Sequence, residues 1–505
     1  MKQSRDKCRA IKITPNLWCF KDTCNVFVFN FAGHGIAIDF GSGQWLNQLP
    51  AIGISNLDHV FLTHHHADQC FGLLRRKSWP FIIHAPAGEN QYLSPAGLKQ
   101  YYRTMAKMNH TPYCLYATIP RGIKAIVYDI RGNSEKVLYG HCFRFVLTPG
   151  HGSNAISIIV KHNGKHLAFC GDAVFAEGKI WEPYQLEWDH WTGKGALAAW
   201  EGIMRLSGIG MDMICPSHGP IITDKPRKVL LTLAERLLDF YRAKGSICAG
   251  EKDRFLVGTP TRSGAIKILS HLYLLGNGYL LVSDSNKGLV VDPTLAEMEK
   301  LEALLKELKC VKLDAAIVSH YHCDHCNGIP YLQRKHGVKA WLHPRVAEKT
   351  SSVGNDPVIY RSKTPVHPDH ILPERGKWRW QEYKFSVAPW PGQTWWHAVY
   401  QAKIDGKKVL FGGDTFQPAS RWNGTGGFCA LNKSRFREGY IASARQALKW
   451  QPHILANGHS CVYYFTRSRF RRIIKWAHFA EQALRAICPT GDPDKDYYTI
   501  LSPKK

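Results

Sequence analysis

Five landmarks in the first half of this 505-residue chain return in the second half, in the same order. The pairs are GIAIDFGSG (35–43) with GLVVDPT (288–294), FLTHHHADQC (61–70) with VSHYHCDHCNG (318–328), FVLTPGHGS (145–153) with SVAPWPGQT (386–394), LAFCGDAVF (167–175) with VLFGGDTF (409–416), and ICPSHGP (214–220) with LANGHSC (455–461). Corresponding residues lie between 241 positions apart (His218 and His459) and 256 positions apart (His64 and His320). This self-similarity predicts a tandem duplication.

Each half alternates short apolar strands with Gly- or Pro-containing turns and amphipathic helices. That pattern predicts layered α/β domains with functional sites on loops at strand ends. The boundary is expected just after the helical pattern RKVLLTLAERLLDFYRAK (227–244). We therefore expect an N-terminal domain over residues 1–247 and a C-terminal domain over residues 248–505.

Composition bounds the class of protein and its partners. Hydrophobic content is 45% and charged content 21%, as in ordinary globular proteins. No apolar run approaches the roughly 18 residues of a membrane span, and the N-terminus has no secretory pattern. We therefore expect a cytoplasmic protein without a membrane partner. Fifteen cysteines without a framework spacing predict reduced thiols.

The formal net charge of +26 is shared by both halves. Residues 1–250 hold 28 Lys and Arg against 18 acidic residues, and residues 251–505 hold 38 against 22, which leaves +10 and +16. Such a charge allows nucleic acid as a partner, although an evenly basic surface explains it as well. We expect a small-molecule substrate first. The densest basic cluster, RSRFRRIIKW (467–476), fits the solvated face of a C-terminal helix.

The two His-rich loops carry the pattern of a metal site. In an extended loop, residues i, i+2 and i+4 share one face, so two sets of side chains can converge: His64, His66 and Asp68, and His320, His322 and Asp324. Imidazole and carboxylate suit zinc, iron or manganese, and no cysteine stands at these positions to favour a softer metal. His65 points the other way, and we expect it beside the site and not among the ligands.

HxHxDH, PGH, GD and a late His-Gly, in this order and once per half, resemble the motifs of the metallo-β-lactamase-fold hydrolases. The resemblance implies an α/β fold, a tandem duplication of the αββα sandwich, with a metal centre at one edge of the two sheets of each copy. It also implies hydrolysis by a metal-activated water, with one or two Zn²⁺ ions per domain and iron or manganese as alternatives. Asp68 and Asp324 would orient that water or accept its proton.

The family pattern assigns a ligand set to each half. In the first half it assigns metal one to His64, His66 and His151, and metal two to Asp68, Gln69 and His218, with Asp172 as the bridge. In the second half it assigns metal one to His320, His322 and Gln393, and metal two to Asp324, His325 and His459, with Asp414 as the bridge. Gln69 and Gln393 replace histidines, and a glutamine carbonyl is a weaker, uncharged ligand. The first half should therefore hold metal one better, and the second half metal two.

The leading hypothesis is a metal-dependent hydrolase of an ester, thioester, lactone or related carbonyl substrate. A phosphodiesterase or nuclease of the same fold is the first alternative, favoured by the net charge; no nucleic-acid-binding type of domain stands between the motifs. The second is a binding or scaffold protein with one or both metal sites non-catalytic. A single-iron oxygenase also stays open, because fold does not fix function. The loop FQPASRWNGTGGF (416–428) differs from its counterpart VFAEGKIWEPYQLEW (174–188), so the two sites should differ in specificity.

Overall fold

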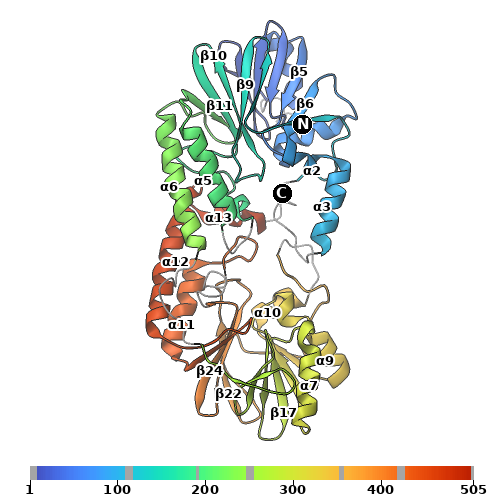
Figure 1. Cartoon of the computed structure of the whole chain (residues 1–505), viewed down its shortest axis with the longest axis vertical. Coiled ribbons are helices and arrows are strands. Elements are labelled where there is room, and N and C mark those ends of the chain that lie inside the picture. Colours follow the sequence, from blue (N-terminus) through green and yellow to red (C-terminus); the bar gives the residue numbers. More distant parts are fainter. Residues whose placement is uncertain are drawn as a thin grey trace.

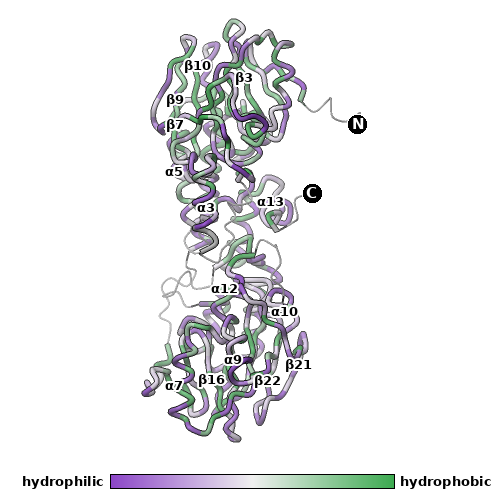
Figure 2. The backbone as a smooth tube through the Cα atoms, turned by 90° about the vertical axis from the view of Figure 1, so that its right-hand side faces the viewer, coloured by the Kyte–Doolittle hydropathy of each residue, from purple (hydrophilic) through white to green (hydrophobic). Residues whose placement is uncertain are grey.

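The computed structural model describes residues 8–107, 118–188, 193–245, 255–351, 358–417 and 427–501. The chain forms an elongated molecule with the N-terminal half at one end and the C-terminal half at the other (Figures 1 and 2). The predicted boundary between residues 247 and 248 lies outside the described residues, as do residues 418–426 of the loop expected to set the specificity of the second site. None of the helices in the described ranges is long and apolar enough to cross a membrane.

The N-terminal half contains two β-sheets. The seven strands of the first sheet follow chain order: β1 (Ala10–Thr14), β2 (Leu17–Lys21), β3 (Asn25–Phe31), β4 (His34–Ile38), β5 (Asn56–Phe61), β6 (Ile82–Pro86) and β7 (Val127–Ile130). The second has the spatial order β12 (Met213–Pro216), β11 (Lys165–Gly171), β10 (Ile156–His162), β9 (His141–Leu147) and β8 (Ser134–Leu138). Successive side chains of a strand face opposite sides. Phe27 and Phe29 of β3 accordingly pack against the second sheet, whereas Val26 and Val28 face the helices on the outer side.

Helices cover both outer faces of this sandwich. Their bounds are α1 (Ala67–Cys70), α2 (Asn90–Leu93), α3 (Pro95–Lys107), α5 (Lys194–Ser207) and α6 (Pro226–Lys244). Leu93 and Leu98 pack on the first sheet, and Ile203 and Leu233 pack on the second. The half therefore has the expected αββα layering.

The C-terminal half repeats this layering. Its first sheet has eight strands in chain order: β13 (Thr259–Pro260), β14 (Ile266–Leu269), β15 (Leu272–Leu274), β16 (Tyr279–Val282), β17 (Lys287–Val291), β18 (Lys312–Ile317), β19 (Lys339–Leu342) and β20 (His370–Ile371). Its second has six: β21 (Gly376–Trp380), β22 (Tyr383–Pro389), β23 (Ala398–Ile404), β24 (Lys407–Gly413), β25 (Ile454–Asn457) and β26 (Val462–Tyr464). The helices are α7 (Met298–Leu308), α8 (Cys323–Cys326), α9 (Ile329–His336), α10 (Pro344–Thr350), α11 (Ala442–Trp450), α12 (Arg467–Ile487) and α13 (Pro493–Asp496). The predicted fold class, two αββα sandwiches in tandem, is confirmed.

The two halves share one hydrophobic core. It runs from α5 and α6 of the N-terminal half to α11 and α12 of the C-terminal half, which line one side of the molecule (Figure 1). At its centre the buried Lys244 ammonium lies 2.6 Å from the Glu187 carboxylate and donates a hydrogen bond to the Phe428 carbonyl, also 2.6 Å away. Glu187 in turn accepts hydrogen bonds from the backbone N–H of Ala430 and from the Tyr497 hydroxyl. A charged pair from the N-terminal half is thus enclosed by C-terminal residues.

The basic segment 467–476 begins α12, and the expectation that it lies on a solvated face is only partly right. Phe470, Ile473 and Trp476 face the shared core. Arg469 is also buried, where it donates a hydrogen bond to the Gln417 carbonyl (2.9 Å) and lies over the Tyr463 ring. The helix needs a wide apolar stripe because it packs against both α6 and α11.

Candidate metal centres

The candidate ligands of the first half lie on loops that follow strands. His64 and His66 lie between β5 and α1, and His151 lies between β9 and β10. Asp172 directly follows β11, and His218 follows β12. Because β5 belongs to the first sheet and the other strands to the second, loops of both sheets meet at one edge of the sandwich.

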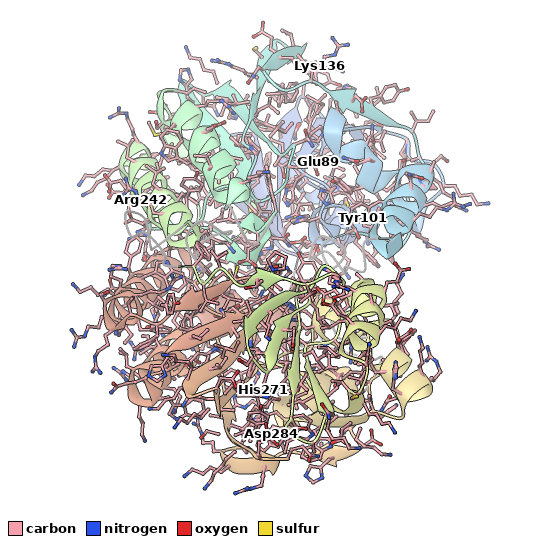
Figure 3. All side chains as sticks on the ribbon, turned by 60° about the horizontal axis from the view of Figure 1, so that its bottom comes forward. Glu89, Tyr101, Lys136, Arg242, His271 and Asp284 are labelled. Carbon is pink, nitrogen blue, oxygen red and sulfur yellow. The ribbon has the colours of Figure 1, made fainter. Side chains whose placement is uncertain are left out.

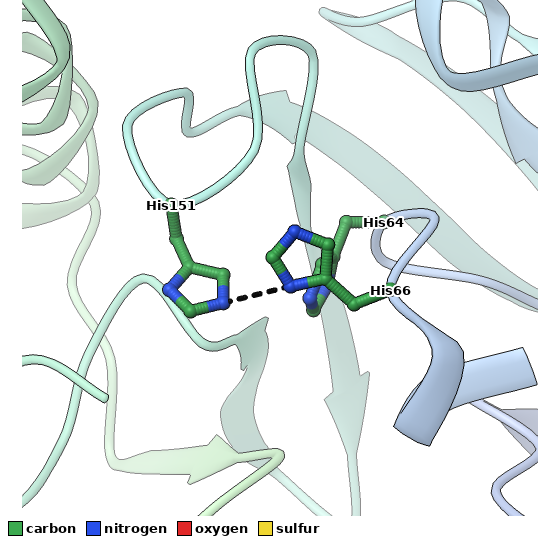
Figure 4. Close-up of side chains that lie close together, drawn as sticks. All are labelled: His64, His66 and His151. Carbon is green, nitrogen blue, oxygen red and sulfur yellow. Dashed lines mark hydrogen bonds between the residues drawn. The ribbon is translucent and has the colours of Figure 1, made fainter. Parts of the chain in front are cut away.

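His64, His66 and His151 form the first cluster. All three are buried, and one ring nitrogen of each lies within 4.8 Å of the others. His151 Nε2 is 3.1 Å from His66 Nδ1 (Figure 4). Burial lowers the pKa of His64 to about 3 and also lowers the pKa of His151. The rings of His64 and His151 therefore stay neutral near pH 7, and their lone pairs are available to a metal ion.

Asp68, Asp172 and His218 form a second cluster beside the first. His218 Nδ1 lies 2.8 Å from Asp172 Oδ1, and His218 Nε2 lies 3.2 Å from Asp68 Oδ2. Burial by itself would lower the pKa of His218, but Asp172 outweighs burial and raises it to about 9. Metal binding at this position would therefore release a proton from His218, as it would from His325 in the second half, whose pKa Asp414 likewise raises against the effect of burial.

Gln69 completes this second cluster with an amide in place of an imidazole. The side chain is buried, and its Nε2 donates a hydrogen bond to Asp172 Oδ2 (3.0 Å). Its Oε1 has no hydrogen-bond partner among the described residues. The amide nitrogen thus satisfies a carboxylate oxygen that a second metal ion would otherwise bind.

In the second half, the predicted second-metal ligands lie together after β18, β24 and β25. Asp324, His325 and His459 form one group of donors, and Asp414 forms another with His325 and His320. Asp414 lies 3.2 Å from His325 Nε2 and 3.1 Å from His459 Nε2. Burial alone would raise the pKa of Asp414, but the two histidines hold it well below its usual range. The carboxylate is therefore ionised.

The predicted first-metal ligands of the second half converge less well. His322 Nδ1 lies 3.1 Å from His320 Nε2, but its Nε2 lies 3.3 Å from the Asn432 side-chain oxygen. Gln393 Nε2 donates a hydrogen bond to Asp414 Oδ2 (3.3 Å), and its Oε1 has no hydrogen-bond partner within the described ranges. The two glutamines, at different subsites, therefore both bind the candidate bridging aspartate of their half through the amide nitrogen.

Two aspartates that sequence reasoning left out of the site position these loops. Asp39 accepts hydrogen bonds from the Thr63 backbone N–H (2.9 Å) and hydroxyl (3.0 Å). Asp292 accepts the same pair from Ser319, at 2.5 and 2.6 Å, and also lies 3.1 Å from His325 Nδ1. Partners of this kind fix the orientation of metal-ligating side chains. Their equivalent places in the repeated landmarks 35–43 and 288–294 were the available signal.

His65 does not join the histidine cluster. Its Nδ1 lies against the Glu89 carboxylate, which is buried inside the N-terminal half (Figure 3). Glu89 also accepts a hydrogen bond from the Asn154 backbone N–H at 2.9 Å. The His65 ring stacks on Tyr92, with the ring centroids 4.2 Å apart. His65 therefore links the first histidine loop to the His151 loop.

The donors fit a divalent transition metal. His64 Nε2 and Gln69 Oε1 in the first half, and Gln393 Oε1 in the second, are buried without a hydrogen-bond partner among the described residues. A buried polar atom without a partner is costly, and a metal ion would satisfy it. Imidazole and carboxylate donors are those that zinc binds in proteins.

The comparison with protein families agrees with this geometry. The model of the metallo-beta-lactamase superfamily matches residues 20–219 and 273–459, one segment in each half. The chain belongs to the metallo-beta-lactamase superfamily. The search of the curated proteins returned no match.

Solved structures similar to this chain are of the same kind. One is a metallo-beta-lactamase with a HARLDQ motif from Cronobacter sakazakii (17% identical, 41% of this chain and 77% of that chain covered, TM-score 0.32). A second is an archaeal superfamily protein from Sulfolobus tokodaii (21% identical, 43% and 82% covered, TM-score 0.32). A third is a family protein from Thermus thermophilus (15% identical, 46% and 83% covered, TM-score 0.35).

Replacing Gln69 with histidine is expected to raise the metal content by about one ion per chain, because an imidazole nitrogen would join Asp68, Asp172 and His218. The full-length variant and the wild type are dialysed against buffer containing Zn²⁺, freed of unbound metal, and compared by elemental analysis. Gln44→His makes the same substitution on an exposed surface and serves as the control. Equal metal content in Gln69→His and wild type would show that Gln69 does not limit the second subsite.

Proposed function

We propose that the protein is a metal-dependent hydrolase of an ester, thioester, lactone or related carbonyl substrate, and that the centre of the second half carries the larger share of the activity. The observation that carries this proposal is the convergence of Asp324, His325, His459 and Asp414 after β18 of the first sheet and β24 and β25 of the second. Superfamily membership supports hydrolysis, and the donor set supports zinc as the metal.

A bound metal ion would polarise the substrate oxygen and acidify a water molecule for attack. The protein's own groups divide the remaining work. The buried, ionised Asp414 supplies a fixed negative charge between His325 and His459. Asp324 is 42% exposed and its Oδ2 lies 3.4 Å from His459 Nε2, so it can reach a water molecule entering from solvent. We assign Asp324 the task of orienting this water and accepting its proton, and Asp68 the same task in the first half.

Phosphodiester hydrolysis is the second candidate. The net charge of +26 favours it, and so does a group of cationic side chains beside the second centre, where Arg345, Lys349 and Lys433 lie over the rings of Trp395 and Trp396.

The full-length protein, depleted of metal with a chelator and reloaded with Zn²⁺, is tested on p-nitrophenyl acetate, a thioester, a lactone, a β-lactam and bis(p-nitrophenyl) phosphate. Turnover of a carbonyl substrate that is lost on chelation and restored by metal is the expected result. Turnover of the phosphodiester alone would replace the proposal with the second candidate. No metal-dependent turnover on any substrate would contradict both and favour a binding or scaffold role.

A further inference from the structure

A cavity of about 390 Å³ lies beside the second centre, between the Gln393 loop and the C-terminal segment. Its lining includes the aromatic rings of Trp395 and Tyr498 and both cations and carboxylates: Lys433, Arg435, Arg437 and Arg485, with Glu438, Glu481 and Asp494. This volume lies within the usual range for pockets that hold small molecules, about 300–1,000 Å³.

Trp395 and Lys433 connect this cavity to the candidate ligands. Trp395 follows Gln393 by two residues, and its backbone N–H donates a hydrogen bond to the Asn432 carbonyl (3.1 Å). The Asn432 side-chain oxygen lies 3.3 Å from His322 Nε2, and Lys433 is the next residue. Two residues of the cavity wall, Trp395 and Lys433, thus lie next to or near residues that form or contact the second centre.

Lys433 is the cation of this cavity that has no anionic partner among the described residues. Arg435 lies 2.5 Å from Asp494, and Arg485 lies 3.1 Å from Glu481. The Lys433 ammonium instead lies over the Trp395 ring, 5.3 Å from its centroid. Burial and the neighbouring cations Arg435 and Lys349 lower the pKa of Lys433, against the opposite effect of the Glu348 and Asp494 carboxylates. An anion at this position would relieve both effects.

The first half lacks this arrangement. The position that matches Trp395 in the repeated landmarks is Ser153, which is exposed. Near the first centre, the Trp181 ring stacks on His218 at 4.3 Å between ring centroids. Burial lowers the pKa of His151, and the carboxylates of Asp172 and then Glu182 oppose this effect. The carboxylate of Glu182 therefore acts at the first centre, whereas the cations Lys433 and Arg345 lie over Trp395 beside the second.

We propose that Lys433 and Trp395 anchor an anionic group, a phosphate or a carboxylate, on the substrate hydrolysed at the second centre. This inference rests on the proposed function, which places the bond that is hydrolysed at the second centre. The cation–π contact of Lys433 with the Trp395 ring, 5.3 Å from its centroid, holds the ammonium at the cavity. The substrate of the second half would then carry a negative charge that the first half does not select.

The test measures equilibrium binding of phenyl phosphate, benzoate and the neutral benzyl alcohol to the zinc-loaded full-length protein by titration calorimetry. Lys433→Met is expected to raise the Kd of one or both anions by about tenfold or more, because a charge-assisted hydrogen bond is lost. The Kd of benzyl alcohol should stay unchanged. Lys433→Arg should retain binding. Lys384→Met removes the same charge from the exposed face of β22 and should match the wild type.

The two anions distinguish a phosphate site from a carboxylate site. Anion binding by Lys433→Met equal to that of the wild type, or no anion binding by the wild type, would overturn the inference, as would an equal loss for benzyl alcohol. Binding is measured without turnover, so the inference and the proposed function can fail separately. A protein that binds anions through Lys433 but hydrolyses no substrate would contradict the proposed function alone.

Discussion

Asp414→Ala is expected to lower turnover of the intact protein by at least about 100-fold, since residues that merely support a metal ligand already cost 10–100-fold when removed. Asp414 contacts His325 at 3.2 Å and His459 at 3.1 Å, and accepts hydrogen bonds from Gln393 and Gln417. Removing its carboxylate leaves both histidines without their shared anion. Steady-state hydrolysis of the substrate identified in the panel measures the loss.

Two further variants serve as controls for the loss of turnover in Asp414→Ala. Asp284→Ala removes a carboxylate that is 77% exposed in the same half, and it should keep wild-type turnover. Asp172→Ala disables the equivalent position of the first half, and it should cost less than Asp414→Ala. Wild-type turnover by a folded Asp414→Ala protein would show that the second centre is not the site of catalysis.

Lys244→Met is expected to destabilise the protein by about 3–5 kcal/mol, because it leaves the buried Glu187 carboxylate without its cation. For a cooperative unit of 150–250 residues this corresponds to a fall of roughly 6–20 °C in Tm. The effect should reach both halves, since the pair lies in their shared core and contacts Phe428 and Ala430 of the second half. Calorimetric melting of the full chain measures it.

A matched control and a rescue accompany this variant. Lys228→Met makes the same substitution at an exposed position of α6 and should leave Tm near that of the wild type. Adding Glu187→Gln to Lys244→Met removes the unpaired charge and should restore part of the loss. If the Tm of Lys244→Met equals that of the wild type, the Lys244–Glu187 pair does not stabilise the contact between the halves.

The repeated motifs predicted much of the fold and which side chains lie near one another. Each motif ends a strand, and strands of two packed sheets end at one edge, so His64, His151 and Asp172 meet although they are far apart in sequence. The same logic gathered Asp324 and His459. Both groups of ligands could be predicted because each motif is a local pattern that is visible in a single sequence.

The partners of polar groups could not be predicted in this way. A sequence shows that Gln69 replaces a histidine, but only packing decides that its amide nitrogen faces Asp172. The apolar stripes of α6 and α12 are visible in sequence, whereas their mutual contact is set by tertiary packing. The enclosure of Lys244 and the burial of Arg469 follow from that contact.

The transition-metal content of the intact chain tests the central claim most directly. Purified full-length protein, loaded with Zn²⁺ and dialysed free of unbound metal, is analysed beside Asp172→Ala and Asp414→Ala. Two centres with one strong subsite each predict about two ions per chain, with the loss of about one in each variant. A wild-type protein that retains no transition metal would contradict the account.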